Sequence, residues 1–276
     1  MDLALDTIDN ETYSAADFNK NSASWIAEHR TALECDLCHN QAFFRKASVS
    51  GQAACFGARP HAEGCERATH SSEESERAEA LEKYVLENPG GHFELKFTLP
   101  KPPSNKTPVT GLVGGGAENK AGKFIKWGKR QESSSSIQAR QILINLATSE
   151  KYRQSTQTIS TPKSGGKVQI CDYFIPFLDA SEGDAGKERG YWGTITKVYP
   201  DEGITWLNTG FPRHMSIVLK DEVRDDLIEA YGLNGVEDLI GAYVLLVGEL
   251  KVSAAAKKYM RPPAARNFAL YIPKEN

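Results

Sequence analysis

The sequence predicts an α+β, multi-domain protein with a small cysteine-rich module near its N-terminus and a five-stranded β-barrel at its C-terminus. Four of the five cysteines lie between positions 35 and 65. Proline and glycine crowd residues 100–122, where we expect a connection between domains. Strand-like runs and one helical run then alternate from residue 168 to the end. A chain of 276 residues has room for two or three such units, since domains usually span about 100–200 residues.

Composition and charge narrow the class of protein. The chain is 40% hydrophobic and 25% charged, which is ordinary for a globular protein. It contains no apolar run of about 18 residues, so we expect no membrane span. The acidic start MDLALD lacks the features of a signal peptide, and we therefore expect a cytoplasmic protein. The net charge of -3 excludes a chain that is basic throughout.

Basic residues are nevertheless concentrated in two stretches. Between Lys96 and Arg130 there are eight lysines and arginines against one acidic residue. Residues 251–266 contain five lysines and arginines and no acidic residue. Acidic residues gather instead in 69–90 and 221–238. Because local charge decides where a polyanion can lie, this distribution is compatible with nucleic-acid binding.

The chain divides into five segments. Residues 71–86 carry an apolar stripe at helical spacing, and Ser72 is placed to cap this helix. Residues 92–99 alternate apolar and polar side chains, as a half-buried strand does. We expect the cysteine-rich module over 1–70, a helix and strand over 71–99, a flexible basic linker over 100–132, a helix and its connection over 133–167, and the barrel over 168–276.

The C-terminal segment has the most regular pattern. Turn residues separate its strand-like runs, and one acidic run with helical spacing interrupts them. In chain order we expect strands at 190–199, 204–209 and 215–219, a helix at 221–231, and strands at 241–252 and 268–272.

This order of three strands, a helix and two strands resembles the OB-fold, from residue 168 or 190 to the end. The resemblance implies an OB-type barrel that binds oligonucleotides across its second and third strands, with help from the loop between the fourth and fifth. A different small barrel or another α+β domain is the alternative that element order leaves open.

The loop between the last two predicted strands is basic and carries Tyr259. Lysine and arginine neutralise phosphates, and each base stacked on an aromatic ring contributes about 1–3 kcal/mol. A solvated hairpin is the alternative for this loop, and packing in the core is the alternative for each tryptophan. The candidate nucleic-acid-binding residues are Lys197, Trp206, Arg213, Lys220, Lys251, Lys257, Lys258, Tyr259, Arg261 and Arg266, with Lys126, Trp127, Lys129 and Arg130 in the linker.

The cysteine cluster has the spacing of a zinc site. Cys35 and Cys38 form the first half, and Cys55 and Cys65 can supply the second, with His61 as a substitute ligand. Four Cys or His ligands close a tetrahedral structural site, and such a zinc ion can contribute about 10–16 kcal/mol of folding free energy. The alternative is that Cys55 is a small buried hydrophobic residue.

Residues 24–70 resemble a known family. Their Cys35-Asp36-Leu37-Cys38 and Cys55-Phe56-Gly57-Ala58-Arg59-Pro60-His61 runs are similar to the N-terminal zinc-ribbon segment of CoiA-like competence proteins. The resemblance implies a zinc-ribbon-like module associated with DNA handling, which in that family precedes a nuclease domain. This sequence has Cys55 where the family pattern has histidine.

Other motifs do not complete a catalytic site, and we assign no catalytic residue. Glu94 and Lys96 have the spacing of a metal-dependent nuclease strand, but no preceding strand supplies a second acid, and an exposed ion pair is the alternative. Gly114 to Lys123 fails the spacing of a phosphate-binding loop. Cys171 has no histidine nearby in the sequence to activate it.

These observations predict a non-enzymatic protein that binds single-stranded nucleic acid, with DNA favoured, in replication, recombination, mobile-element or phage biology. A protein-protein adaptor that uses the barrel and the zinc module is the second hypothesis. A divergent metal-dependent nuclease that uses Glu94 and Lys96 is the third.

Overall fold

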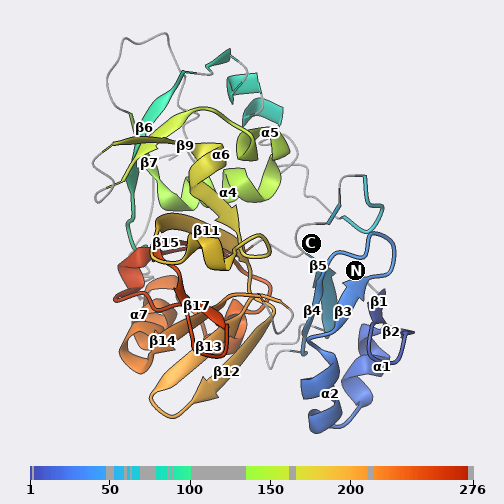
Figure 1. The fold of residues 1–276 in the computed structure, drawn as a ribbon. Helices are drawn as coiled ribbons and strands as arrows, with labels where there is room; N and C mark the ends of the chain where they lie inside the picture. The colour runs from blue at the N-terminus through green and yellow to red at the C-terminus, as the bar shows by residue number, and fades with distance from the viewer. Residues whose placement is uncertain are drawn as a thin grey trace, which may run out of the picture.

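A computed structural model describes residues 1, 3–47, 53–58, 61–62, 64–68, 79–81, 83–85, 87–88, 90–100, 135–161, 166–210 and 214–272. These residues form a mixed α+β structure with three hydrophobic clusters, one in an N-terminal module and two farther along the chain. Figure 1 shows the module beside the larger remainder of the molecule. Among the described residues, no helix has both the length and the apolar character that crossing a membrane requires.

The N-terminal module combines a three-stranded sheet, two short helices and a hairpin. Ser14 and Ser22 begin the two helices, since each side chain accepts a hydrogen bond from the backbone N–H three residues on. Phe18, Phe44 and Phe56 form the aromatic centre of its core. The elements are β1 (Leu3–Asp6), β2 (Glu11–Ser14), α1 (Ala15–Lys20), α2 (Ala23–His29), β3 (Leu33–Cys35), β4 (Ala42–Arg45) and β5 (Cys55–Ala58), with sheet order β2-β1-β3 and a β4-β5 hairpin.

The middle of the chain builds a second sheet in the order β7-β6-β8-β9. Residues 79–81, 83–85 and 87 are helical, as predicted for the end of the 71–86 segment. The helix predicted within 133–167 begins only at Ala139, because Ser135–Gln138 pairs with β6 as a parallel strand. The elements are β6 (His92–Lys96), β7 (Ser135–Gln138), α4 (Ala139–Thr148), α5 (Glu150–Arg153), β8 (Thr158–Ser160), β9 (Lys167–Gln169) and α6 (Ile170–Tyr173).

The C-terminal part contains two further sheets. One has the order β10-β11-β15-β18 and the other the order β12-β13-β14-β17-β16, with α7 between β14 and β15. The strands are β10 (Phe174–Pro176), β11 (Glu188–Thr194), β12 (Lys197–Asp201), β13 (Ile204–Asn208), β14 (Ser216–Lys220), β15 (Tyr243–Glu249), β16 (Lys251–Val252), β17 (Lys258–Met260) and β18 (Phe268–Tyr271), and the helices are η1 (Glu182–Asp184), α7 (Asp221–Tyr231), η2 (Val236–Leu239) and η3 (Ala265–Asn267).

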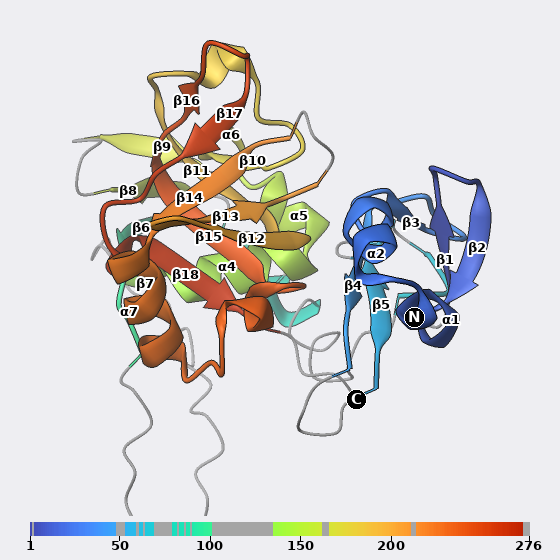
Figure 2. The ribbon, with the colours of Figure 1, turned by 90° about the horizontal axis from the view of Figure 1, so that it is seen from below.

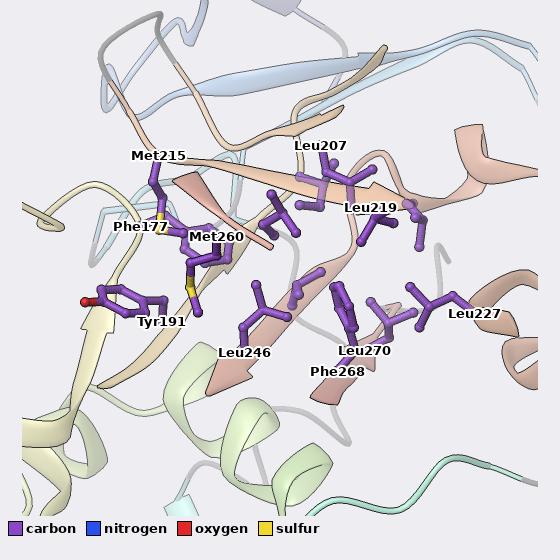
Figure 3. Close-up of a cluster of buried hydrophobic side chains, with 14 of the residues drawn as sticks. Phe177, Tyr191, Leu207, Met215, Leu219, Leu227, Leu246, Met260, Phe268 and Leu270 are labelled. Carbon is purple, nitrogen blue, oxygen red and sulfur yellow. The ribbon is translucent and has the colours of Figure 1, made fainter. Parts of the chain in front are cut away.

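The sheet that contains β15 and β18 is buried on both faces. Val244 and Leu246 point into the cluster shared with the other C-terminal sheet, whereas Leu245 points into the cluster that α4 covers. Likewise, Phe268 points into the first cluster and Ala269 into the cluster that α4 covers. Figure 3 shows Leu246, Phe268 and Leu270 facing Leu207 and Leu219 across the first of these clusters. Alternating side chains therefore join three layers into one body.

The described residues contain no closed barrel, so the expectation of one over 168–276 is corrected to two sheets. The predicted strand over 190–199 is split. The N–H of Ile195 donates to Ala242, which directly precedes β15 of one sheet, while the N–H of Thr196 donates to Asn208 of the other sheet. The predicted strand over 241–252 is split in the same way at Leu250, between β15 and β16. Each split is a corner at which the chain passes from one sheet to the other.

The module packs directly on the C-terminal sheets through β4 and α2. Phe43 is 1% exposed and belongs to the C-terminal hydrophobic cluster, although its chain neighbour Phe44 belongs to the module's own core. Arg45 donates to the carbonyl of Ile240 at 2.8 Å, and Lys197 donates to the carbonyl of Ala27 at 3.0 Å. Figure 2 shows the β4-β5 hairpin on the side of the module that faces the C-terminal sheets.

Candidate functional site

Two turns of the module bring four possible metal ligands together. In the first turn, which follows β3, the N–H of Cys35 donates to Asn40 at 2.8 Å and the N–H of His39 donates to Cys35 at 3.0 Å. In the second turn the N–H of Cys65 donates to the carbonyl of Ala62 at 3.1 Å. The ligand atoms of Cys35, Cys38, His61 and Cys65 all lie within 4.8 Å of one another, so the group can hold a metal ion.

The distances within this group are those of separate ligands. The Sγ atoms of Cys35 and Cys65 are 3.8 Å apart, whereas a disulfide would place them at about 2.05 Å. The Nδ1 atom of His61 lies 3.5 Å from the Sγ of Cys38 and 3.4 Å from the Sγ of Cys65. The cysteines of the group are free thiols in the described structure.

Backbone groups prepare Cys38 to act as a thiolate. Burial raises the pKa of its thiol, but hydrogen bonds from the backbone of Ala62 and Asn40 and from the neighbouring thiols of Cys35 and Cys65 outweigh burial, so this pKa lies below its ordinary value. Burial raises the pKa of Cys35. A metal ion would favour the thiolate of both, since it binds the deprotonated sulfur.

The fourth member of the group is the substitute ligand, His61. Cys55 is absent from it and lies on β5, where it pairs with Arg45 of β4. The hairpin fixes this position, because every residue of β5 is held in register with β4. His61 follows the hairpin and reaches Cys65 across a short turn.

A second group of candidate residues lies on the outer face of β12 and β13. Val198 and Leu207 point into the core, so the residues that alternate with them point outward. These outward side chains form a pocket of about 220 Å³ together with a residue from the loop before β17. The pocket is lined by Lys197, Tyr199, Trp206, Asn208 and Lys257.

The pocket combines an exposed ring, a half-buried ring and positive charge. Tyr199 lies opposite Trp206 in the β12-β13 register and is 55% exposed. The ammonium of Lys257 lies 4.2 Å from the centre of the Trp206 ring, in a cation-π contact. Burial and the nearby charge of Arg30 lower the pKa of Lys197. The arrangement offers the exposed ring of Tyr199, the edge of the Trp206–Lys257 pair and ammonium groups to a ligand.

Tyr259 and Lys251 extend the same face. Asn208 pairs with Ser216, Ser216 with Tyr259, and Tyr259 with Lys251. Directly paired residues in a sheet point to the same side, so this row continues from the pocket across to β16.

The remaining predicted binding residues are placed elsewhere. Lys258 donates to the carbonyl of Ala180. Lys220 ends β14, pairs with Ile204 and lies four residues along the strand from the Ser216-Asn208 pair. Arg261 is exposed after β17, and Arg266 is exposed in η3. Arg213, Lys126, Trp127, Lys129, Arg130 and nearly all of the 100–132 linker lie outside the described residues.

Tyr199 and Asn208 line the pocket but were not among the binding residues predicted from the sequence. The turn between the two strands carried the signal, because a hairpin that pairs Asp201 with Ile204 must place Tyr199 beside Trp206 and Lys197 beside Asn208.

Glu94 and Lys96 form an exposed ion pair, with 3.3 Å between Oε2 and Nζ. Glu94 belongs to none of the groups of possible metal ligands in the described part of the chain. A second group of possible metal ligands consists of Asp6, Asp9 and His29. Oδ2 of the fully buried Asp6 lies 2.6 Å from Nδ1 of His29, and the His29 ring stacks on Trp25.

No protein-family model matches this sequence, and no curated protein matches it.

Proposed function

We propose that this chain is a non-enzymatic cytoplasmic protein that binds single-stranded nucleic acid through the outer face of β12 and β13. The observation that carries the proposal is the pocket in which Lys197 and Lys257 flank the rings of Tyr199 and Trp206. Ammonium groups attract phosphates, and exposed rings stack on bases. Bases are free to stack in this way when they are unpaired, which favours a single strand over a duplex.

An OB-type interpretation of the C-terminal domain supports this assignment. Strands β11 to β14, helix α7 and strands β15 to β17 follow the element order of that fold. The chain passes between the two sheets at Ile195 and at Leu250, and β14 pairs in parallel with β17. In this interpretation β13 and β14 are the second and third strands, and Lys257 lies in the loop between the fourth and fifth, which are the parts that OB-folds use for oligonucleotides.

We further propose that the metal of the N-terminal module is a structural zinc ion. With Zn–S bonds of about 2.3 Å and Zn–N bonds of about 2.0–2.1 Å, a tetrahedron places two sulfurs about 3.8 Å apart and a sulfur and a nitrogen about 3.6 Å apart. In the structure the Sγ atoms of Cys35 and Cys65 are 3.8 Å apart, and Nδ1 of His61 lies 3.5 and 3.4 Å from the Sγ atoms of Cys38 and Cys65. Three cysteines and one histidine use all four positions, which leaves none for a substrate.

Fluorescence anisotropy with labelled single-stranded DNA, duplex DNA and RNA at low and moderate salt tests the function. We expect the single strands to bind most tightly and the affinity to fall steeply with salt, since counterion release drives such binding. Tyr199→Ala should weaken binding by about 1–3 kcal/mol through lost stacking. Leu178→Ala is the matched control, because Leu178 is 52% exposed, similar to Tyr199 at 55%, and lies outside the pocket. Absence of binding at low salt contradicts the proposal.

The adaptor hypothesis is the second candidate, because α7 presents an acidic surface. Glu222, Asp225, Asp226 and Glu229 are exposed on this helix, which can dock on a basic partner. Co-purification with nuclease treatment distinguishes the two functions, since partners held through nucleic acid are lost and partners held by α7 are kept.

A further inference from the structure

The polar groups of the pocket are dominated by hydrogen-bond donors. Lys197 and Lys257 each contribute an ammonium group, which donates and never accepts. The phenol of Tyr199 can donate or accept. The side chain that decides the character of the pocket is therefore Asn208, whose amide carries both a donor and an acceptor.

Ser216 engages the oxygen end of the Asn208 amide. The Ser216 hydroxyl donates to Oδ1 of Asn208 at 2.8 Å. Ser216 is 3% exposed and held in β14 directly opposite Asn208, so this contact is locked by the sheet. The backbone carbonyl of Asn208 is also engaged, because the N–H and the hydroxyl of Thr196 both donate to it. The Nδ2 hydrogens are then what Asn208 offers to a ligand.

We propose that the pocket selects nucleobases with a keto group, namely thymine, uracil and guanine, over cytosine and adenine. This inference depends on the proposed function. Thymine offers O4 and guanine offers O6 as acceptors, whereas cytosine and adenine place an amino donor at the corresponding edge. An amino group of cytosine or adenine would face Nδ2 of Asn208 and two ammonium groups, all of which are hydrogen-bond donors. No hydrogen bond can form between two donors, and leaving a buried hydrogen bond unmade is unfavourable.

A comparison of oligo-dT and oligo-dC of equal length tests this selection. Both are pyrimidines with similar stacking, and oligo-dU controls for the methyl group of thymine. We expect oligo-dT and oligo-dU to bind at least about fivefold more tightly than oligo-dC, the size expected of one hydrogen bond. Asn208→Ala should remove this preference. Asn208→Asp keeps the shape of the side chain but replaces the donor with an acceptor, and should reverse the preference towards oligo-dC.

The outcomes separate the inference from the proposed function. Binding of all three oligonucleotides with equal affinity, or tighter binding of oligo-dC, overturns the keto selection and leaves the proposed function intact. A preference that persists in both Asn208→Ala and Asn208→Asp overturns the assignment to this pocket. Absence of binding to every oligonucleotide contradicts the proposed function and the inference together. Circular dichroism of each variant establishes that it is folded.

Discussion

Arg67 binds Asp36 through two parallel hydrogen bonds, from Nε to Oδ1 at 3.1 Å and from Nη2 to Oδ2 at 2.7 Å. Asp36 directly follows Cys35, and Arg67 lies two residues after Cys65. The pair therefore joins the two turns that carry the possible metal ligands. Its geometry is specific to arginine, because a planar guanidinium matches both carboxylate oxygens at once.

Arg67→Lys should weaken metal binding about 10- to 100-fold, the usual effect of losing a residue that orients the ligands. Lysine keeps the charge but cannot make the paired contact. Competition with a chromophoric chelator measures the affinity. Arg224→Lys is the control, since Arg224 also binds aspartates but lies on α7. Equal affinities of the two variants would show that the pair does not organise the site.

Cys55→Ser should retain one zinc ion per chain, whereas His61→Ala should lose it. The reason is geometric, because Nδ1 of His61 lies within 3.5 Å of two cysteine sulfurs and Cys55 is outside the group. Elemental analysis of the purified variants measures the zinc content. A Cys55→Ser protein without metal and a His61→Ala protein with metal would restore Cys55 as the ligand.

The metal group shows how far spacing can predict a site. Cys35 and Cys38 are close in sequence, so the turn between them fixes their geometry locally. The choice between Cys55 and His61 depends on where β5 ends, and this is set by its pairing with β4. The sequence therefore predicted a four-ligand site, but it favoured Cys55 and gave His61 only as the substitute, whereas the structure brings His61 into the group.

In the fold too, features set by local sequence were predictable and features set by distant partners were not. Alternation and turn residues predicted most C-terminal strands, because they are local signals. The corner at Ile195 could not be predicted, since it depends on partners at Ala242 and Asn208. The burial of Phe43 in the C-terminal cluster was missed for the same reason, because neighbouring residues in β4 share its apolar character.

Gly241→Ala should destabilise the protein by about 2–5 kcal/mol. Gly241 has a φ of +81°, and an added Cβ would lie 2.5 Å from the Phe43 ring. Left-handed backbone costs about 1–2 kcal/mol for a residue with a side chain, and overpacking adds about 1–3 kcal/mol. Urea denaturation measures the free energy of unfolding.

Gly203→Ala separates the backbone cost from the cost of overpacking against Phe43. Gly203 has a φ of +72°, and no atom lies within 4 Å of its added Cβ, so only the backbone cost of about 1–2 kcal/mol applies. If both variants lose the same stability, Phe43 does not pack against Gly241 as tightly as the structure indicates.

His214 should make the protein less stable in acid. Burial and the charge of Lys258 lower the pKa of His214 below 6.5. Between this lowered pKa and 6.5 the unfolded chain binds more protons than the folded one, so stability falls as the pH falls through that window. His214→Gln should lose less stability than the parent between about pH 7.5 and about pH 5.5. Urea denaturation at both pH values gives the loss of stability for each protein. Any effect of metal release at low pH is the same in both proteins and cancels in the comparison. An equal loss in both would contradict the prediction.

Lys257→Ala should reduce the salt dependence of nucleic-acid binding. The ammonium of Lys257 lies over Trp206 in the pocket, where it can neutralise a phosphate beside a stacked base. Losing one phosphate contact lowers the slope of log affinity against log salt by about 0.7 for a single strand. Anisotropy titrations over a series of salt concentrations measure this slope. Lys220→Ala is the matched control, because Lys220 is exposed at the far end of β14 beside the acidic first turn of α7 and should leave the slope unchanged. A slope that changes for Lys220→Ala and stays constant for Lys257→Ala would move the binding face away from β12 and β13.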